Sequence, residues 1–199
     1  MRPAREHGFT LLELLVVVGL VGVLGAFAVP MIGSALASDG IKSDAQALTN
    51  LVGVAKMRAS AGFTRARVRA NLLDGTFMLE RWDRVAGAWV VEGGLRPMYR
   101  GVQFGFATMT APPPDSQTTL AMSPPCRTGV AAGSSQIGNT ACIVFNSRGL
   151  PVDGDGAIFG GHGLYVTDGA AVFGTTVTAT PRIRMWATGL SSPLWRQQQ

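Results

Sequence analysis

Residues 8–30 read GFTLLELLVVVGLVGVLGAFAVP, a long apolar run with one charged residue inside it. From Phe9 to Val29 the run contains 21 residues, and the charged one is Glu13. A helix of this length extends about 31 Å, because each residue adds ~1.5 Å. The hydrocarbon core of a bilayer is about 30 Å thick. The run is therefore predicted to form a transmembrane helix segment over residues 9–30.

Glu13 is the unusual residue of this run. A carboxylate among Leu and Val side chains costs on the order of 3 kcal/mol on insertion into a bilayer, and such a residue usually marks a functional site. It needs a cationic partner. A cut between Gly8 and Phe9 would create one, because the new α-amino group is charged near neutral pH. Within one chain this amine lies at the helix end where positive charge is unfavourable, so we expect a neighbouring subunit to bring its amine to Glu13.

The segment from Gly8 to Glu13, preceded by a leader with Arg2 and Arg5, resembles the processing motif of type IV pilins and type II secretion pseudopilins. The resemblance implies that residues 1–8 are a prepilin leader, and that a prepilin peptidase cuts after Gly8 and methylates Phe9. It also implies that Glu13 serves subunit assembly. The partners it implies are other pilin or pseudopilin subunits, the peptidase and the inner membrane.

Two other interpretations of the N-terminus stay open. Arg2 and Arg5 before an apolar run also fit a secretory signal peptide cut after Ala28, which would release a soluble exported protein. Glu13 and the 16 uncharged residues from Leu14 to Val29 argue against it, because the apolar region of such peptides is uncharged and slightly shorter. A plain membrane anchor leaves Glu13 without a role.

Composition indicates one membrane-tethered domain. The chain has 17 basic and 12 acidic residues, a formal net charge of +5. Without residues 1–8 it keeps 191 residues and a charge of +4, and the part after the helix suffices for one small domain with its own core. Cys126 and Cys142 fit one disulfide in an exported domain. Closing that loop of about 15 residues would stabilise the fold by ~3 kcal/mol.

The helical period continues beyond the apolar run. Apolar residues recur at three- and four-residue spacing, at Ile41, Ala45, Leu48, Leu51, Val52, Ala55 and Ala59. Pro30 is expected to kink the helix rather than end it. We therefore expect residues 31–62 to form the periplasmic half of the helix, with an apolar stripe that packs on the domain that follows.

Residues 63–199 are predicted to form a β-rich globular domain. Arg65, Arg67 and Arg69 alternate with apolar residues, as in a half-buried strand with solvated arginines, and Asp74-Gly75 is a two-residue hairpin signal. The other expected elements are strands at 76–82, 89–91, 101–107, 143–145, 163–167, 171–173 and 175–186, an irregular connection at 111–135 and a loose tail at 193–199.

The second half of the chain adds to the resemblance. An Ala-rich helix, the segments FNSRG at 145–149 and LYVTDG at 164–169, and a final Arg-x-Arg strand are similar to the GspH/FimT-like minor pilins and pseudopilins. The resemblance implies an α+β, pilin-like fold, with a long N-terminal helix packed on small antiparallel sheets. The implied function is that of a structural subunit of a type IV pilus or type II secretion pseudopilus. The resemblance also implies a location in the bacterial inner membrane with a single pass and a periplasmic domain, and a surface filament after assembly.

A DNA-binding minor pilin that acts in DNA uptake is an alternative function. Some FimT-like members bind DNA through a Gly-Arg-x-Arg segment near the C-terminus. Residues 181–184 read PRIR, so Arg182 and Arg184 match that segment and Pro181 replaces its glycine. Two arginines on a strand face would contact phosphates with salt-dependent affinity, although a solvated strand face also explains them.

Catalysis has little support in the sequence. His162 is the one histidine outside the leader and lies in a glycine-rich segment that is expected to be a loop. The sequence has no nucleophile elbow, zinc-protease motif or phosphate loop. Asp153-x-Asp155-Gly156 begins like a calcium loop but lacks the later Glu, so a plain turn is expected. We predict no enzyme activity, cofactor, metal site or small-molecule substrate.

Overall fold

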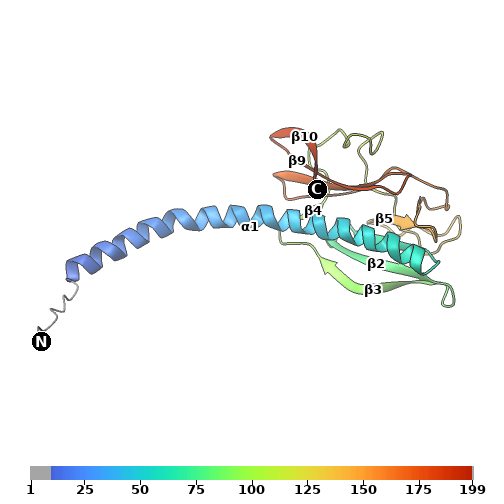
Figure 1. Cartoon of the computed structure of the whole chain (residues 1–199), viewed down its shortest axis with the longest axis horizontal. Coiled ribbons are helices and arrows are strands. Elements are labelled where there is room, and N and C mark those ends of the chain that lie inside the picture. Colours follow the sequence, from blue (N-terminus) through green and yellow to red (C-terminus); the bar gives the residue numbers. More distant parts are fainter. Residues whose placement is uncertain (1–9, 199) are drawn as a thin grey trace, which may run out of the picture. The chain divides into compact units, whose positions relative to one another are not determined.

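The computed structural model describes the backbone of residues 10–198 and the side chains of residues 10–26 and 39–198. Helix α1 (Leu11–Ala61) spans 51 residues and continues through position 30 (Figure 1). The chain divides into two compact units between Asp39 and Gly40, each described separately below. No helical segment among the described residues combines the length and hydropathy that a membrane crossing requires.

The C-terminus of α1 is closed by a turn at Phe63. Phe63 has a φ of 47°, in the left-handed region. The N–H of Gly62 donates to the carbonyl of Arg58 at 3.0 Å, and the N–H of Thr64 donates to the carbonyl of Ala59 at 3.2 Å. These bonds satisfy carbonyl groups that have no partner inside the helix. The predicted helix end near residue 62 is confirmed.

The apolar stripe of α1 forms one side of the domain core. All seven stripe residues are buried, and the most exposed of them, Leu51, shows 8% of its surface. A single cluster joins the stripe to apolar side chains of both sheets, including Val68 and Leu164. Burying each Leu, Ile or Val side chain contributes about 1.5–3 kcal/mol. The predicted packing of the stripe on the β-rich domain is therefore confirmed.

The first sheet has the strand order β3-β2-β1-β5-β6. All its pairs are antiparallel, and β1 lies at the centre, where Val68 faces Leu79 on one neighbour and Ile143 on the other. Its strands are β1 (Ala66–Asn71), β2 (Thr76–Asp83), β3 (Ala88–Pro97), β5 (Thr140–Phe145) and β6 (Pro151–Val152).

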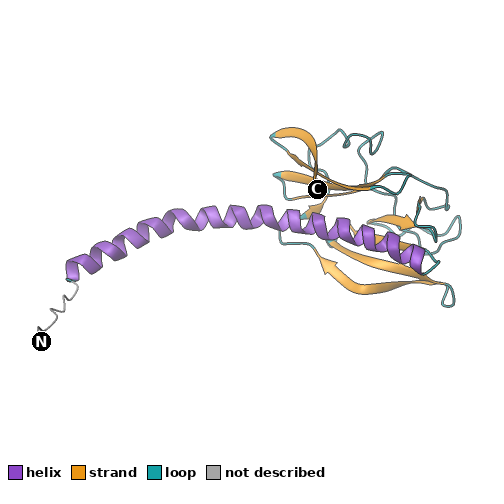
Figure 2. Ribbon diagram, in the orientation of Figure 1, coloured by secondary structure: helices purple, strands orange, loops and turns teal. Residues whose placement is uncertain are grey.

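The second sheet has the order β10-β9-β8-β7-β4, again with antiparallel pairs. In Figure 2 the strands of the two sheets flank the C-terminal part of α1. The sheet consists of β4 (Gln103–Phe104), β7 (His162–Thr167), β8 (Ala171–Val177), β9 (Ile183–Gly189) and β10 (Ser192–Gln198). The α+β arrangement of a long N-terminal helix packed on two small antiparallel sheets is confirmed.

Three local predictions were wrong. The β1–β2 hairpin has a four-residue loop, 72–75, rather than a two-residue turn, because Asn71 Oδ1 accepts bonds from the N–H groups of Leu73 and Asp74. The run 175–186 is not one strand, since a turn at 178–182 separates β8 from β9. The tail expected to be loose forms β10, whose Trp195 indole N–H donates to the carbonyl of Ala111 at 2.9 Å.

Candidate functional site: the N-terminal motif and an arginine cluster

The N-terminal motif begins α1 with a capped first turn. Thr10 precedes the helix, and its Oγ1 accepts a hydrogen bond from the N–H of Glu13 at 3.2 Å, while its carbonyl accepts from the N–H of Leu14 at 3.2 Å. Thr-x-x-Glu is the sequence of a capping box, and a carboxylate in the first turn is favoured by the helix dipole. Glu13 therefore suits its position in the helix. The predicted processing residues, Gly8 and Phe9, lie outside the described residues.

The first turns of α1 expose their apolar side chains. Leu11 is 81% exposed, and the least exposed of the large apolar side chains as far as Leu24, Val17, is 50% exposed. Contiguous apolar surface of this kind marks contact with protein or membrane. Within its own unit, this part of the helix leaves the surface around Glu13 uncovered.

Arg182 and Arg184 lie at the start of β9 in the second sheet. Arg182 is exposed in the turn before the strand, and Arg184 is partly buried with its guanidinium 5.9 Å from the ring centroid of Trp186. Lys56 of α1 donates its Nζ to the carbonyl of Pro181 at 3.1 Å. Neither arginine forms an ion pair with any side chain in the described part of the chain. The Lys56 ammonium therefore lies at the turn that precedes Arg182.

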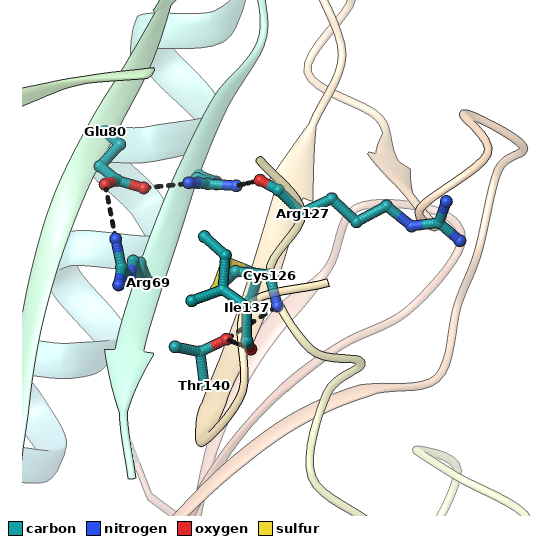
Figure 3. A network of polar contacts seen from close by, with 8 residues as sticks. Arg69, Glu80, Cys126, Arg127, Ile137 and Thr140 are labelled. Carbon is teal, nitrogen blue, oxygen red and sulfur yellow. Dashed lines mark hydrogen bonds and ion pairs between the residues drawn. A yellow bond between two sulfur atoms is a disulfide. The ribbon is translucent and has the colours of Figure 1, made fainter. Parts of the chain in front are cut away.

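The arginines of β1 lie in the other sheet, and they do not form the solvated stripe that was predicted. Arg67 faces Glu80 across the ladder, and its Nε donates to Glu80 Oε2 at 2.5 Å. Its Nη1 donates to the carbonyl of Arg127 at 2.6 Å, and its guanidinium carbon lies 4.0 Å from the ring centroid of Trp89. Arg69 Nη1 approaches the other carboxylate oxygen of Glu80 at 3.5 Å (Figure 3).

Burial is what separates Arg67 from an ordinary strand arginine. Its side chain is 2% exposed, and that of Glu80 is 5% exposed. Burial lowers the pKa of the Arg67 guanidinium from its ordinary value, and the adjacent Glu80 carboxylate raises it again. A charge in this position stays ionised only because a counter-ion and hydrogen-bond acceptors accompany it.

A disulfide holds the segment that buries Arg67. Cys126 and Cys142 are bonded, with their Cα atoms 5.0 Å apart, so the irregular segment before β5 is tied to the central part of the first sheet. The N–H of Cys126 donates to Thr140 Oγ1 at 3.0 Å, and this hydroxyl donates to the carbonyl of Ile137 at 2.6 Å (Figure 3). The next residue, Arg127, supplies the carbonyl that Arg67 uses.

The turn 153–156 packs against arginine side chains, which explains its composition. Asp153 Oδ1 accepts bonds from the N–H groups of residues 155 and 157, and Asp155 pairs with Arg127 at 3.3 Å. A Cβ at Gly154 would collide with the Arg127 guanidinium, and one at Gly156 would lie 2.9 Å from Nη2 of Arg65. Among the described residues, no three His, Cys, Asp or Glu side chains gather as metal ligands would.

His162 is the first residue of β7 and is 1% exposed, so its prediction as a loop residue was wrong. Its ring packs edge-on against Phe159, with centroids 4.9 Å apart. Burial lowers its pKa to about 4, although the Val152 backbone and the charge of Asp153 partly oppose this. Among the described residues, neither ring nitrogen has a hydrogen-bond partner of normal geometry. The imidazole is therefore neutral at pH 7.

Sequence reasoning missed the cluster of Arg67, Glu80 and Trp89. It identified Arg67 as part of an alternating strand, but it had no means of showing that a distant segment covers that strand. The available signal was Glu80, an acidic residue in the next predicted strand, because oppositely charged residues on neighbouring strands often face one another. The structure places Arg65 and Arg127 beside this cluster and keeps Arg182 and Arg184 apart from it, in another sheet.

Comparisons with known proteins give one family match. Residues 3–29 match the family model described as the prokaryotic N-terminal methylation motif. No curated protein sequence matches the chain. Two solved structures of the minor pseudopilin EpsH from the type II secretion system of Vibrio cholerae are similar, each at 10% identity. One has a TM-score of 0.44 over 74% of this chain and 93% of that chain, and the other has a TM-score of 0.40 over 80% and 96%.

Proposed function

We propose that the chain, which carries an N-terminal methylation motif over residues 3–29, is a minor pilin or pseudopilin, a structural subunit of a type IV pilus or type II secretion pseudopilus. The motif implies assembly with other pilins and processing by a prepilin peptidase at the inner membrane. In this role the chain is a substrate of processing enzymes and not an enzyme itself.

The motif around Glu13 is the observation that carries this proposal. From Phe9 onward, the matched region contains a capped helix start, a single carboxylate and a surface of exposed apolar side chains. A filament core of packed helices would cover that surface. It would also bring the α-amino group of one processed subunit to Glu13 of another, so that neither charge is left alone in an apolar environment.

The proposed route begins with insertion in the inner membrane through residues 9–30, with residues 31–62 and the domain of residues 63–199 in the periplasm. Processing would then remove residues 1–8 and methylate Phe9. The support for the span is the sequence itself, which has a single charge between Phe9 and Val29. The disulfide supports a periplasmic domain, because such bonds persist in oxidising compartments.

Substitution of Glu13 tests the assembly role. Glu13→Val is expected to abolish or sharply reduce incorporation into filaments, while membrane insertion and processing continue. Glu13→Gln is the matched control for shape, since it keeps a polar group of the same size and removes only the charge. If the charge pairs with a neighbouring subunit, both variants fail to assemble. Normal assembly of Glu13→Val would refute the role that we give to Glu13.

Binding of DNA in uptake is a second candidate function, favoured by Arg182 and Arg184, which are in no ion pair among the described residues, and by Lys56 at the turn before them. Each phosphate contact steepens the dependence of affinity on salt. A gel-shift series at several salt concentrations therefore tests it. The double variant Arg182→Ala, Arg184→Ala is expected to bind DNA more weakly and with a shallower salt slope. Unchanged affinity and slope would remove this function.

Mass spectrometry of the mature N-terminus separates the proposal from a signal-peptide interpretation. Processing as a pilin gives a chain that begins with methylated Phe9. Cleavage as a secretory signal gives a chain that begins at Val29, without the apolar helix, and a chain that still carries His7 contradicts both forms of processing.

A further inference from the structure

A small cavity lies on the face of the first sheet that points away from α1. Its wall includes Arg65 and Arg67 of the β1 region, Trp89 of β3, Arg127 of the disulfide-tied segment and His162 of β7. The cavity has a volume of about 380 Å³ when its open mouth is included. The part that the centre of a water molecule can occupy is only about 20 Å³. The cavity therefore has room for a single small group.

The wall of this cavity is rich in hydrogen-bond donors that lack acceptors. In the described part of the chain, the indole nitrogen of Trp89 is buried without a partner, and the ring nitrogens of His162 have none of normal geometry, although the Val152 backbone lies near the ring. Arg67 uses Nε and Nη1 on Glu80 and the Arg127 carbonyl, and Nη2 has no such bond. A neutral imidazole keeps one N–H to donate, so several N–H groups surround one small space.

Most of the carboxylate oxygens near the wall already accept hydrogen bonds or pair with arginines. Asp153 Oδ1 accepts two backbone N–H groups of its own turn, and Asp155 pairs with Arg127. Glu80 pairs with Arg67 and Arg69. Arg65 donates to the carbonyl of Val130 and has no carboxylate partner among the described residues. Arg65 is therefore the one guanidinium of the wall that is in no ion pair among the described residues, and Asp153 is the one carboxylate of the wall.

We propose that this cavity is a binding site for one carboxylate group. A carboxylate is acceptor-only and offers about four lone-pair sites, which matches a wall of donors. A water molecule in the same space would also have to donate, for example to the ring nitrogen of His162 that carries no proton. The carboxylate comes either from a small free anion or from a Glu or Asp side chain of a partner protein. The site does not depend on the proposed filament role.

His162 supplies a reporter at the site. The sequence has two histidines, so a full-length chain with His7→Gln keeps only His162. In detergent at pH 7 and constant ionic strength, the ring signals of isotope-labelled His162 are followed by NMR while sodium acetate replaces sodium chloride. Acetate is expected to shift these signals saturably, and to raise the pKa of His162 because an adjacent anion favours the imidazolium.

Two arginine variants near β1 test whether acetate acts on the His162 signals by binding in the cavity. Arg65→Gln is expected to weaken acetate binding about tenfold, the loss of one charge-assisted hydrogen bond. Arg69→Gln removes the same charge four residues away, at a side chain outside the cavity wall, and is expected to leave the affinity unchanged. Thermal unfolding of each variant shows whether the domain remains folded. Equal effects of the two variants would refute the site.

A second probe identifies the source of the carboxylate. A glutamate with blocked amino and α-carboxyl groups presents only its side-chain carboxylate. Tighter binding of this probe than of acetate supports a partner protein, and equal or weaker binding supports a small free anion. If neither probe causes a saturable change in the His162 signals, the proposal is wrong and the cavity holds only water.

Discussion

The buried pair of Arg67 and Glu80 gives the most specific stability prediction. Glu80→Gln keeps the shape of the side chain but removes the negative charge that accompanies a guanidinium only 2% exposed. Breaking a buried ion pair by removing one partner costs about 3–5 kcal/mol, because the other charge stays buried. Arg67 keeps its bond to the Arg127 carbonyl and its contact with Trp89, so we expect a loss near ~3 kcal/mol.

Glu92→Gln is a matched control in the same sheet. Glu92 pairs with Arg58 at 3.0 Å, but the two side chains are 32% and 56% exposed. Exposed pairs contribute about 0–1 kcal/mol, since solvent screens them. The same chemical change at Glu92 should therefore lower the unfolding free energy by less than ~1 kcal/mol.

Urea unfolding of the full-length protein in a mild non-ionic detergent measures both variants. Trp82 and Trp89 lie in the same sheet, with ring centroids 5.3 Å apart, so tryptophan fluorescence reports on the region of the pair. The apolar double variant Arg67→Met, Glu80→Leu should recover most of the loss, because no buried charge remains. A cost for Glu80→Gln that equals the cost for Glu92→Gln would refute a buried, charged Arg67.

Three further predictions concern the disulfide, His162 and the turn beside Arg127. Replacing both cysteines by serine should lower the unfolding free energy by ~3 kcal/mol, measured by urea unfolding against the parent protein with and without reductant. The pKa of His162 is about 4 in the folded state and 6.5 as the ordinary value, so the unfolded state binds the proton first as the pH falls. The free energy of unfolding should therefore drop by up to ~3 kcal/mol between pH 6.5 and 4. His162→Phe should remove this drop from the pH profile measured by urea unfolding. Gly154→Ala should displace the Arg127 guanidinium and lower the melting temperature, whereas Gly138→Ala, where a Cβ meets nothing within 4 Å, should not.

The helix and its N-terminal motif were predictable because the residues that form their contacts lie close together in the sequence. The stripe from Ile41 to Ala59 follows the helical period, and every residue in it is buried as expected. The capping threonine and Glu13 lie three positions apart, so their hydrogen bond depends on nothing distant in the chain. Local periodicity determines such contacts, and no tertiary information is needed to find them.

The arginine cluster was not predictable for the opposite reason. A two-residue turn at Asp74-Gly75 would have set Arg69 opposite Glu80, but the four-residue loop sets Arg67 there. The difference arises from one side-chain amide, Asn71, which caps the turn. Hairpin register follows from turn type and loop length, so the wrong loop length gave the wrong register. The burial of Arg67 required in addition a covering segment about sixty residues away in the chain.

The disulfide joins two segments that are distant in the sequence and so makes the arginine cluster possible. It ties the covering segment to β5, and that segment places the carbonyl of Arg127 on Arg67 and the guanidinium of Arg127 at the cavity. Reduction is expected to loosen the segment and with it the cover over Arg67 and the cavity wall, and disulfides persist in oxidising compartments. The disulfide-tied cluster is therefore consistent with the periplasmic location that we propose from the N-terminal motif.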